Sequence, residues 1–159
     1  MRIVSGGQTG VDRAALDIAL DLGLRCGGWC PRGRRAEDGP LPSRYPLKDT
    51  PSADYAQRTE WNVRDSDGTL VLNRGVLDGG TALTIELARR LRKPCLVVDL
   101  DAPPEPAAVR AWLAARGLGT LNVAGPRERK RPGIYRLSGG FLVRVLDERG
   151  RISPTRKSS

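Results

Sequence analysis

Apolar residues occur along the chain in two alternating patterns. Short apolar runs predict five buried strands, at 2–5, 24–30, 68–73, 95–100 and 120–124. Between most of them, apolar residues recur at helical spacing, which predicts helices at 11–22, 52–65, 81–92, 104–116 and 134–146. Alternating strands and helices are typical of an α/β fold, so we expect a three-layer sandwich around a mainly parallel sheet of about five strands.

Three local features refine this prediction. Ser52 is expected to cap the helix at 52–65, because serine oxygens accept hydrogen bonds from the first helical N–H groups. The run CLVVDL at 95–100 is nearly continuous, as in parallel strands that are buried on both faces. Residues 31–51 contain five prolines and two glycines, which predicts a long irregular loop, and such loops are usually functional or disordered.

The predicted site lies at one edge of this sheet. Right-handed crossovers bring the loops that follow parallel strands to the carboxyl edge, where α/β proteins bind their ligands. We therefore expect the loops at 6–10, 31–51, 74–80 and 125–132 to surround a ligand.

Two of these loops contain paired glycines before a helix. Small residues allow a ligand to approach the backbone, and N–H groups at a helix start attract anions. The predicted ligand contacts in these loops, with hydroxyls from the three threonines, are Gly6, Gly7, Gln8, Thr9, Gly10, Gly79, Gly80, Thr81 and Thr84. The alternative is that Gly79 and Gly80 only make a tight turn. No Gly-Lys-Ser/Thr follows the first loop, so it is not a Walker A motif.

Charged side chains near these loops are further candidates. Gly125 and Arg127 are predicted ligand contacts after the last strand, and Arg127 could bind an oxyanion through two N–H groups, or lie on a basic surface. Arg58, Asn62 and Asp65 share one helix face, which lines either a polar pocket or solvent. Asp12 and Arg13 could reach a ligand or pair locally. Arg32, Arg34 and Arg35 could close a loop over an anion or only add solubility.

Composition excludes several kinds of site. The 159 residues fit one domain and include no histidine, which excludes Ser-His-Asp and Cys-His catalysis and histidine-bound zinc or iron. Three cysteines are too few for a four-thiolate zinc site, so we expect that the protein binds no metal. We also expect the three thiols to be reduced. No run approaches 18 apolar residues, and MRIVSGG has no signal-peptide core, so we expect a cytoplasmic protein without a membrane partner.

The positive charge is concentrated near the C-terminus. Residues 125–159 hold ten basic and three acidic residues, against 17 basic and 15 acidic in the remainder. We expect a domain at 1–146 followed by a basic, flexible tail at 147–159. Nucleic acid is not an expected partner, because no aromatic residues alternate with the terminal charges.

Several segments together resemble a known family. GGQTGVDRAALDIAL (6–20), residues 27–47, YAQRTEWNVRDSDGTLVL (55–72), GGT (79–81) and NVAGPRERKRPGIY (122–135) are similar to the "putative molybdenum carrier" family, related to the YpsA-like branch of the SLOG group of Rossmann-like proteins. The resemblance implies a Rossmann-like domain that binds a nucleotide or anion, and carriage of molybdenum cofactor or a related oxyanion. The wider group includes phosphoribohydrolases with a PGGxGTxxE pattern; here Asp78 replaces the proline and Thr84 falls at the glutamate position.

The sequence thus leaves two main functions open. The first is a non-catalytic binding protein for a phosphorylated or oxyanionic ligand, in which self-association is also expected. The second is a nucleotide-processing hydrolase, whose acid or base would be Asp12, Asp65, Asp67 or Glu86, or a sensor of a nucleotide-derived ligand.

Overall fold

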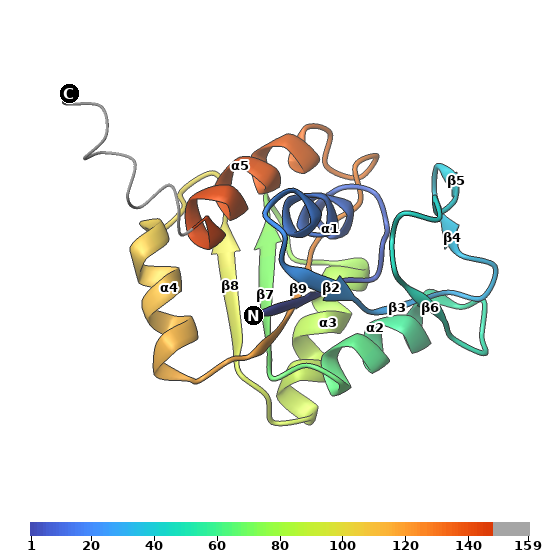
Figure 1. Cartoon of the computed structure of the whole chain (residues 1–159), viewed down its shortest axis with the longest axis horizontal. Helices are drawn as coiled ribbons and strands as arrows, with labels where there is room; N and C mark the ends of the chain where they lie inside the picture. The colour runs from blue at the N-terminus through green and yellow to red at the C-terminus, as the bar shows by residue number, and fades with distance from the viewer. Residues whose placement is uncertain (148–159) are drawn as a thin grey trace.

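The computed structural model describes residues 1–147 and has a parallel sheet between two layers of helices (Figure 1). The sheet contains β1 (Arg2–Val4), β2 (Arg25–Gly27), β7 (Gly68–Asn73), β8 (Cys95–Asp99) and β9 (Thr120–Ala124). Its order is β2-β1-β9-β7-β8, and every neighbouring pair is parallel. This confirms the predicted α/β sandwich.

The helices divide into two layers because their apolar residues join different clusters. Residues of α1 (Val11–Asp21), α4 (Pro106–Ala115) and α5 (Ile134–Leu146) pack with Leu70 and Leu72 of β7 in the main core. On the opposite face, α2 (Tyr55–Arg64) packs against α3 (Gly79–Arg90) through Val63, Leu87 and Ala88. The helix α5 is continuous through Gly139 and Gly140.

The last strand of the chain occupies the centre of the sheet. A doubly wound Rossmann sheet has the strand order 3-2-1-4-5-6, with the first strand in the middle. If β9 is counted first, followed by β1, β2, β7 and β8, the observed order becomes 3-2-1-4-5. The fold is therefore a circularly permuted Rossmann arrangement, and the reversal of strand order lies between β9 and β7.

The predicted strand at 24–30 is divided in two. Gly28 has a φ of 131°, and a Cβ there would fall 2.4 Å from the carbonyl oxygen of Ser5, so the chain turns away from the main sheet. Beyond it, β3 (Trp29–Cys30) pairs with β6 (Lys48–Asp49). Asn62 holds this bend, since its amide accepts from the N–H of Trp29 at 2.8 Å and donates to the Trp29 carbonyl at 2.9 Å.

Residues 31–51 form an ordered loop on one side of α1. Its regular secondary structure is limited to β6 and to a short hairpin, whose strands β4 (Arg35–Ala36) and β5 (Gly39–Pro40) have two residues each. Leu41, Tyr45 and Leu47 of this loop pack against Leu16 and Cys30 in a small core of their own. The loop is therefore fixed to the domain by apolar contacts.

Two details of the prediction were wrong. The helix α2 begins at Tyr55 and not at Ser52, because the serine lies in a turn where its carbonyl accepts from Thr50 and its hydroxyl accepts from the N–H of Asp54. Strand β8 is not buried on both faces. It lies at the sheet edge, beyond the cover of the helices on one face, and Val97 is 41% exposed.

Other predictions concern the ends of the chain. Apart from Asp147, the predicted tail at 147–159 lies outside the described residues. Within residues 1–147, no helix combines the length and apolar character needed to cross a bilayer. The division into a domain and a tail stays a prediction.

Candidate functional site

A cavity of about 190 Å³, the inner cavity, lies at the carboxyl edge of the sheet where the strand order reverses. It is bounded by the loop after β1, the helix α2, the first turns of α3, and the end of β9 with its following loop. The lining residues used below are Gly6, Gln8, Asp12, Tyr55, Arg58, Asn62, Gly80, Thr81, Thr84, Gly125, Arg127 and Lys130. The two glycine loops therefore meet at one cavity.

A buried ion pair forms one wall of the inner cavity. Arg58 of α2 donates from Nη1 to Oδ2 of Asp12 at 2.8 Å, and the two residues are only 9% and 5% exposed. Burial raises the pKa of the Asp12 carboxyl, and the Arg58 charge opposes that rise. The Nε of Arg58 is buried and has no hydrogen-bond partner within the described residues. A buried guanidinium N–H at a cavity wall is a donor that a bound oxyanion can satisfy.

The N-terminus of α3 forms the opposite wall. The first N–H groups of a helix have no partner within it, and they carry partial positive charge. No side chain in the described part of the chain caps α3, and its residues Gly80 and Thr81 line the inner cavity. The nearby helix α5 differs, because the Glu128 carboxylate accepts from the N–H groups of Gly133 and Tyr135. Of these two N-termini, α3 is the one available to an anion.

The loop after β9 joins the inner cavity to an outer cavity of about 450 Å³. Both cavities are lined by Gln8, Tyr55, Arg127 and Lys130, and the outer one also by Glu37 and Arg129. Two of the cations have an acidic neighbour, since Nε of Arg127 lies 3.1 Å from Oε2 of Glu37 and Nζ of Lys130 lies 2.6 Å from Oδ1 of Asp78. The outer cavity is a polar vestibule with a basic rim.

Five of the predicted ligand residues do not line the inner cavity. Gly7 faces Leu41 and Leu47, Gly10 lies against the 126–128 backbone, and Gly79 lies beside Lys130. Thr9 donates its hydroxyl hydrogen to Glu37. Arg13 forms an ion pair with Asp38 at 2.9 Å and donates to the Gly7 carbonyl, so it holds the 31–51 loop to α1.

Two residues that line the inner cavity also have structural partners. Thr84 donates to the Gly80 carbonyl at 2.9 Å, and Asn62 holds Trp29 as described above.

Arg34, one of the predicted loop cations, does not face either cavity. It donates to the carbonyls of four residues of its own loop, Leu41, Pro42, Tyr45 and Leu47.

Three of the four candidate catalytic acids lie outside both cavities. Asp65 pairs with Arg64 and accepts from the Trp29 indole. Asp67 accepts from the N–H groups of Gly119 and Thr120, and Glu86 pairs with Arg89 and Arg90 on the surface of α3. Asp12 alone of these acids lines the inner cavity.

Sequence reasoning missed several residues that shape the cavities. Lys130 belongs to the basic run after β9, and that run is a signal that could have identified it. Tyr55 is the first residue of α2, and the misplaced helix start concealed it. Glu37 comes from the irregular loop, and no pattern in the sequence indicates that it reaches the site.

The donor set suits an oxyanion better than a protein-bound metal. Between residues 1 and 147, no three histidine, cysteine, aspartate or glutamate side chains gather as metal ligands do. Guanidinium groups, an ammonium group and helix amides are donors that recognise phosphate, molybdate or similar anions.

Comparison with known proteins agrees with the fold and its permutation. A crystal structure at 1.45 Å of a "Putative molybdenum carrier protein" from Syntrophus aciditrophicus is 47% identical, with a TM-score of 0.87 over 91% of this chain and 94% of that one. No curated protein matches the sequence. The model of the circularly permuted YpsA family of the SLOG group matches residues 3–146, so the chain belongs to that family.

Proposed function

We propose that this protein binds a small phosphorylated or oxyanionic molecule in the inner cavity and does not transform it. The observation that carries the proposal is that Arg58, whose Nε has no hydrogen-bond partner among residues 1–147, and the N-terminus of α3, which no side chain of those residues caps, line the same cavity. A volume of about 190 Å³ suits a compact anionic group, and larger ligand parts would extend into the outer cavity.

Molybdenum cofactor or molybdate is the candidate cargo, because the similar Syntrophus protein is named a molybdenum carrier. Molybdate is an oxyanion, and the cofactor carries a phosphate group. Arg58 and the first amides of α3 would hold either molybdate itself or the phosphate of the cofactor, and in the second case the cofactor would keep its own sulfur ligands to the metal. This mode of binding suits a carrier, which has to release its cargo.

Binding of inorganic phosphate and of molybdate, measured by calorimetry, tests the proposal. Arg58→Lys keeps the positive charge but leaves fewer N–H groups to reach both Asp12 and an anion. We expect this variant to bind at least about tenfold more weakly, as for loss of a charge-assisted hydrogen bond. Arg90→Lys, an exposed change at the other end of α3, is the matched control and should bind normally. Normal affinity in Arg58→Lys, or no binding by the unmodified protein, would contradict the proposal.

A second residue tests the mouth of the cavity. Arg127 lies on the rim of both cavities, and its side chain is 52% exposed. Arg127→Ala should weaken anion binding by about 1–3 kcal/mol. Unchanged affinity would remove Arg127 from the site.

A hydrolase acting on nucleotides is the second candidate, because Asp12 is the one candidate acid that lines the inner cavity. A carboxyl group at that position can serve as a general acid or base. Incubation with a panel of nucleoside monophosphates would reveal freed base or phosphate. Turnover that disappears in Asp12→Asn would support an enzyme and defeat the carrier proposal.

Two further expectations are proposals of the same kind. The three cysteines within the described residues are unpaired, which supports a reducing compartment such as the cytoplasm. The exposed edge strand β8, with Val97 at its surface, supports self-association. Fractionation of cells and analytical ultracentrifugation test these two proposals.

A further inference from the structure

A carboxylate of the protein itself occupies donors of the outer cavity. Oε1 of Glu37 accepts from the hydroxyl of Thr9 and, at 3.1 Å, from the backbone N–H of Arg129. Oε2 of Glu37 lies 3.1 Å from Nε of Arg127. The Glu37 side chain is only 11% exposed, so these contacts are largely shielded from water.

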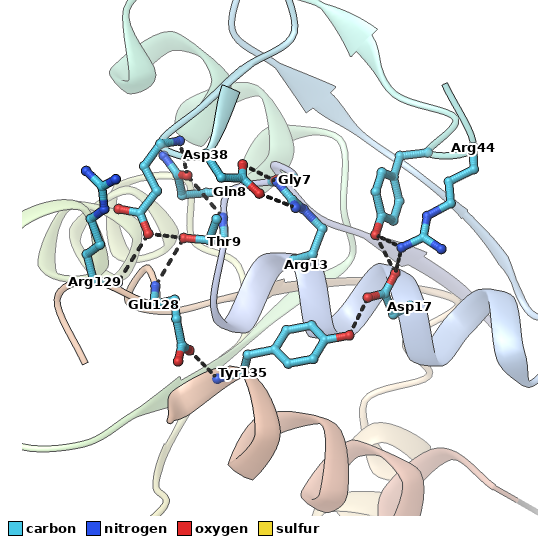
Figure 2. Close-up of polar contacts among 12 residues, drawn as sticks. Gly7, Gln8, Thr9, Arg13, Asp17, Asp38, Arg44, Glu128, Arg129 and Tyr135 are labelled. Carbon is cyan, nitrogen blue, oxygen red and sulfur yellow. Dashed lines mark hydrogen bonds and ion pairs between the residues drawn. The ribbon is translucent and has the colours of Figure 1, made fainter. Parts of the chain in front are cut away.

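These donors are of the kinds that bind a phosphate or another oxyanion. A hydroxyl, a backbone N–H and a guanidinium converge on one acidic group. The Thr9 hydroxyl is already aligned, because its oxygen accepts from the N–H of Glu128 at 3.1 Å. Figure 2 shows Thr9, Glu128 and Arg129 gathered beside the start of α1. Thr9 and Arg127, which the sequence predicted as ligand contacts, therefore both contact Glu37 instead.

The Glu37 carboxylate is incompletely satisfied in this position. Its Oε2 is buried and makes no hydrogen bond within the described residues, although Arg127 is close enough for an ion pair. A buried carboxylate oxygen without a hydrogen bond is unfavourable, which lowers the free energy needed to move it.

The loop would stay attached to the domain if this carboxylate moved. The backbone N–H of Glu37 donates to Oε1 of Gln8 at 2.8 Å, and the neighbouring Asp38 pairs with Arg13 through two hydrogen bonds (Figure 2). Neither contact involves the Glu37 side chain. Rotation of that side chain is therefore enough to release its donors.

We propose that the Glu37 carboxylate competes with the ligand for Arg127, which lines both cavities, and that an anion bound in the inner cavity draws Arg127 away, so that Glu37 also leaves Thr9 and the Arg129 amide. This inference rests on the proposed function and specifies how the same site is regulated. A protein whose binding-competent state is only partly populated binds more weakly by that fraction. Glu37 thus lowers affinity and favours release of the ligand.

The test compares phosphate affinity, measured by calorimetry, in the full-length protein and its variants. Glu37→Gln and Glu37→Ala should each bind inorganic phosphate more tightly, by about tenfold if the competent state is about a tenth populated. Glu60→Gln is the matched control, because it removes one negative charge from an exposed position of α2 that lines neither cavity. It should bind phosphate as the unmodified protein does.

A second measurement needs no variant and so does not depend on folding of the mutants. Carbodiimide labelling of carboxylates, read by mass spectrometry, should modify Glu37 slowly in the free protein. Saturating phosphate or molybdate should increase labelling of Glu37 relative to Glu60.

The outcomes separate this inference from the proposed function. If the unmodified protein binds phosphate and Arg58→Lys weakens it, but the Glu37 variants bind no more tightly, the competitor is refuted and the binding site stands. Labelling of Glu37 that stays constant or falls with phosphate would refute it equally. If neither the unmodified protein nor any variant binds phosphate or molybdate, both proposals fail.

Discussion

Gly6 lies so close to Arg58 that its position admits no side chain. A Cβ at Gly6 would fall 1.8 Å from Nη1 of Arg58, and the buried pair with Asp12 keeps this guanidinium in place. Gly6→Ala should therefore lower the free energy of unfolding by about 1–3 kcal/mol, as overpacking does, and also weaken phosphate binding. Urea denaturation and calorimetry measure the two effects.

The matched control for this change is Gly140→Ala. Gly140 is a helical residue of α5 whose added Cβ would meet no atom within 4 Å. Alanine should stabilise the helix there by about 0.5–1 kcal/mol. A Gly6→Ala variant as stable as Gly140→Ala would show that Arg58 can move without lowering the free energy of unfolding.

The Tyr135 phenol links α5 to α1 and makes stability depend on pH. It donates to Oδ2 of Asp17 at 2.5 Å, and this bond to a carboxylate raises the pKa of Tyr135 to about 12 from 10.0. A raised pKa means that the neutral phenol stabilises the fold fully below pH 10.0 and that the contribution disappears as pH rises through about 12. Tyr135→Phe should flatten the decline of the unfolding free energy in this window. Identical slopes for both proteins would contradict the bond.

At the scale of residues, the sequence revealed those parts of the site whose signal is local. Gly6 and Gly80 adjoin strand–helix junctions, and the helical spacing of Arg58 and Asn62 placed both on one face. Glu37 could not be found in this way. Its contact with Arg129 joins segments 92 residues apart, and only the packed loop brings them together.

Among the elements, the 31–51 loop depends on one side chain. Arg34 has a φ of 56°, and its guanidinium donates to four carbonyls between Leu41 and Leu47. Arg34→Ala removes these bonds, and although the carbonyls of Pro42 and Tyr45 keep backbone partners, those of Leu41 and Leu47 lose this donor. We expect trypsin to cleave the loop at Arg35 or Arg44 several-fold faster, because local unfolding of the loop becomes easier.

The control for the loop is Arg32→Ala, since Arg32 is exposed and is held by its backbone N–H, which donates to the Ser52 carbonyl and is kept in the variant. Cleavage at Arg35 and Arg44 should then remain at the unmodified rate. Equal cleavage in the two variants would show that the apolar residues Leu41, Tyr45 and Leu47 hold the loop without Arg34.

The elements also show where periodicity stops being informative. The run at 68–73 became β7 with the predicted bounds, because a buried strand needs only apolar residues. Strand β8 is similarly apolar but lies at the sheet edge, a position set by strand order. The bend at Gly28 depends on the carbonyl of Ser5, the residue that follows β1. Composition predicts an element, whereas its neighbours decide its burial.

For the whole molecule, alternation of strands and helices predicted the layers but not the strand order. The pattern of a permuted chain is the same as that of an unpermuted one, since both alternate strand and helix. Only the pairing of β9 with β1 and β7 reveals that the last strand is central. The cavity lies beside β9 for the same reason, because strand order reverses there.

Permuting the chain back tests this view of the molecule. A variant that starts at Gly117, continues through β9 and α5, and passes through residues 148–159 into Met1 would end at Arg116. Met1 and Leu146 line the same cavity, so the distance that residues 148–159 have to span is small. Gly117 lies in an exposed turn, where a break in the chain is tolerated. We expect this variant to fold cooperatively and to bind phosphate like the natural chain, as circular dichroism, urea denaturation and calorimetry would show.

A second permutant opened between Leu70 and Val71, inside the buried strand β7, should fail to fold. Failure of the first permutant together with success of the second would mean that the order of the elements along the chain, and not their packing, determines the fold.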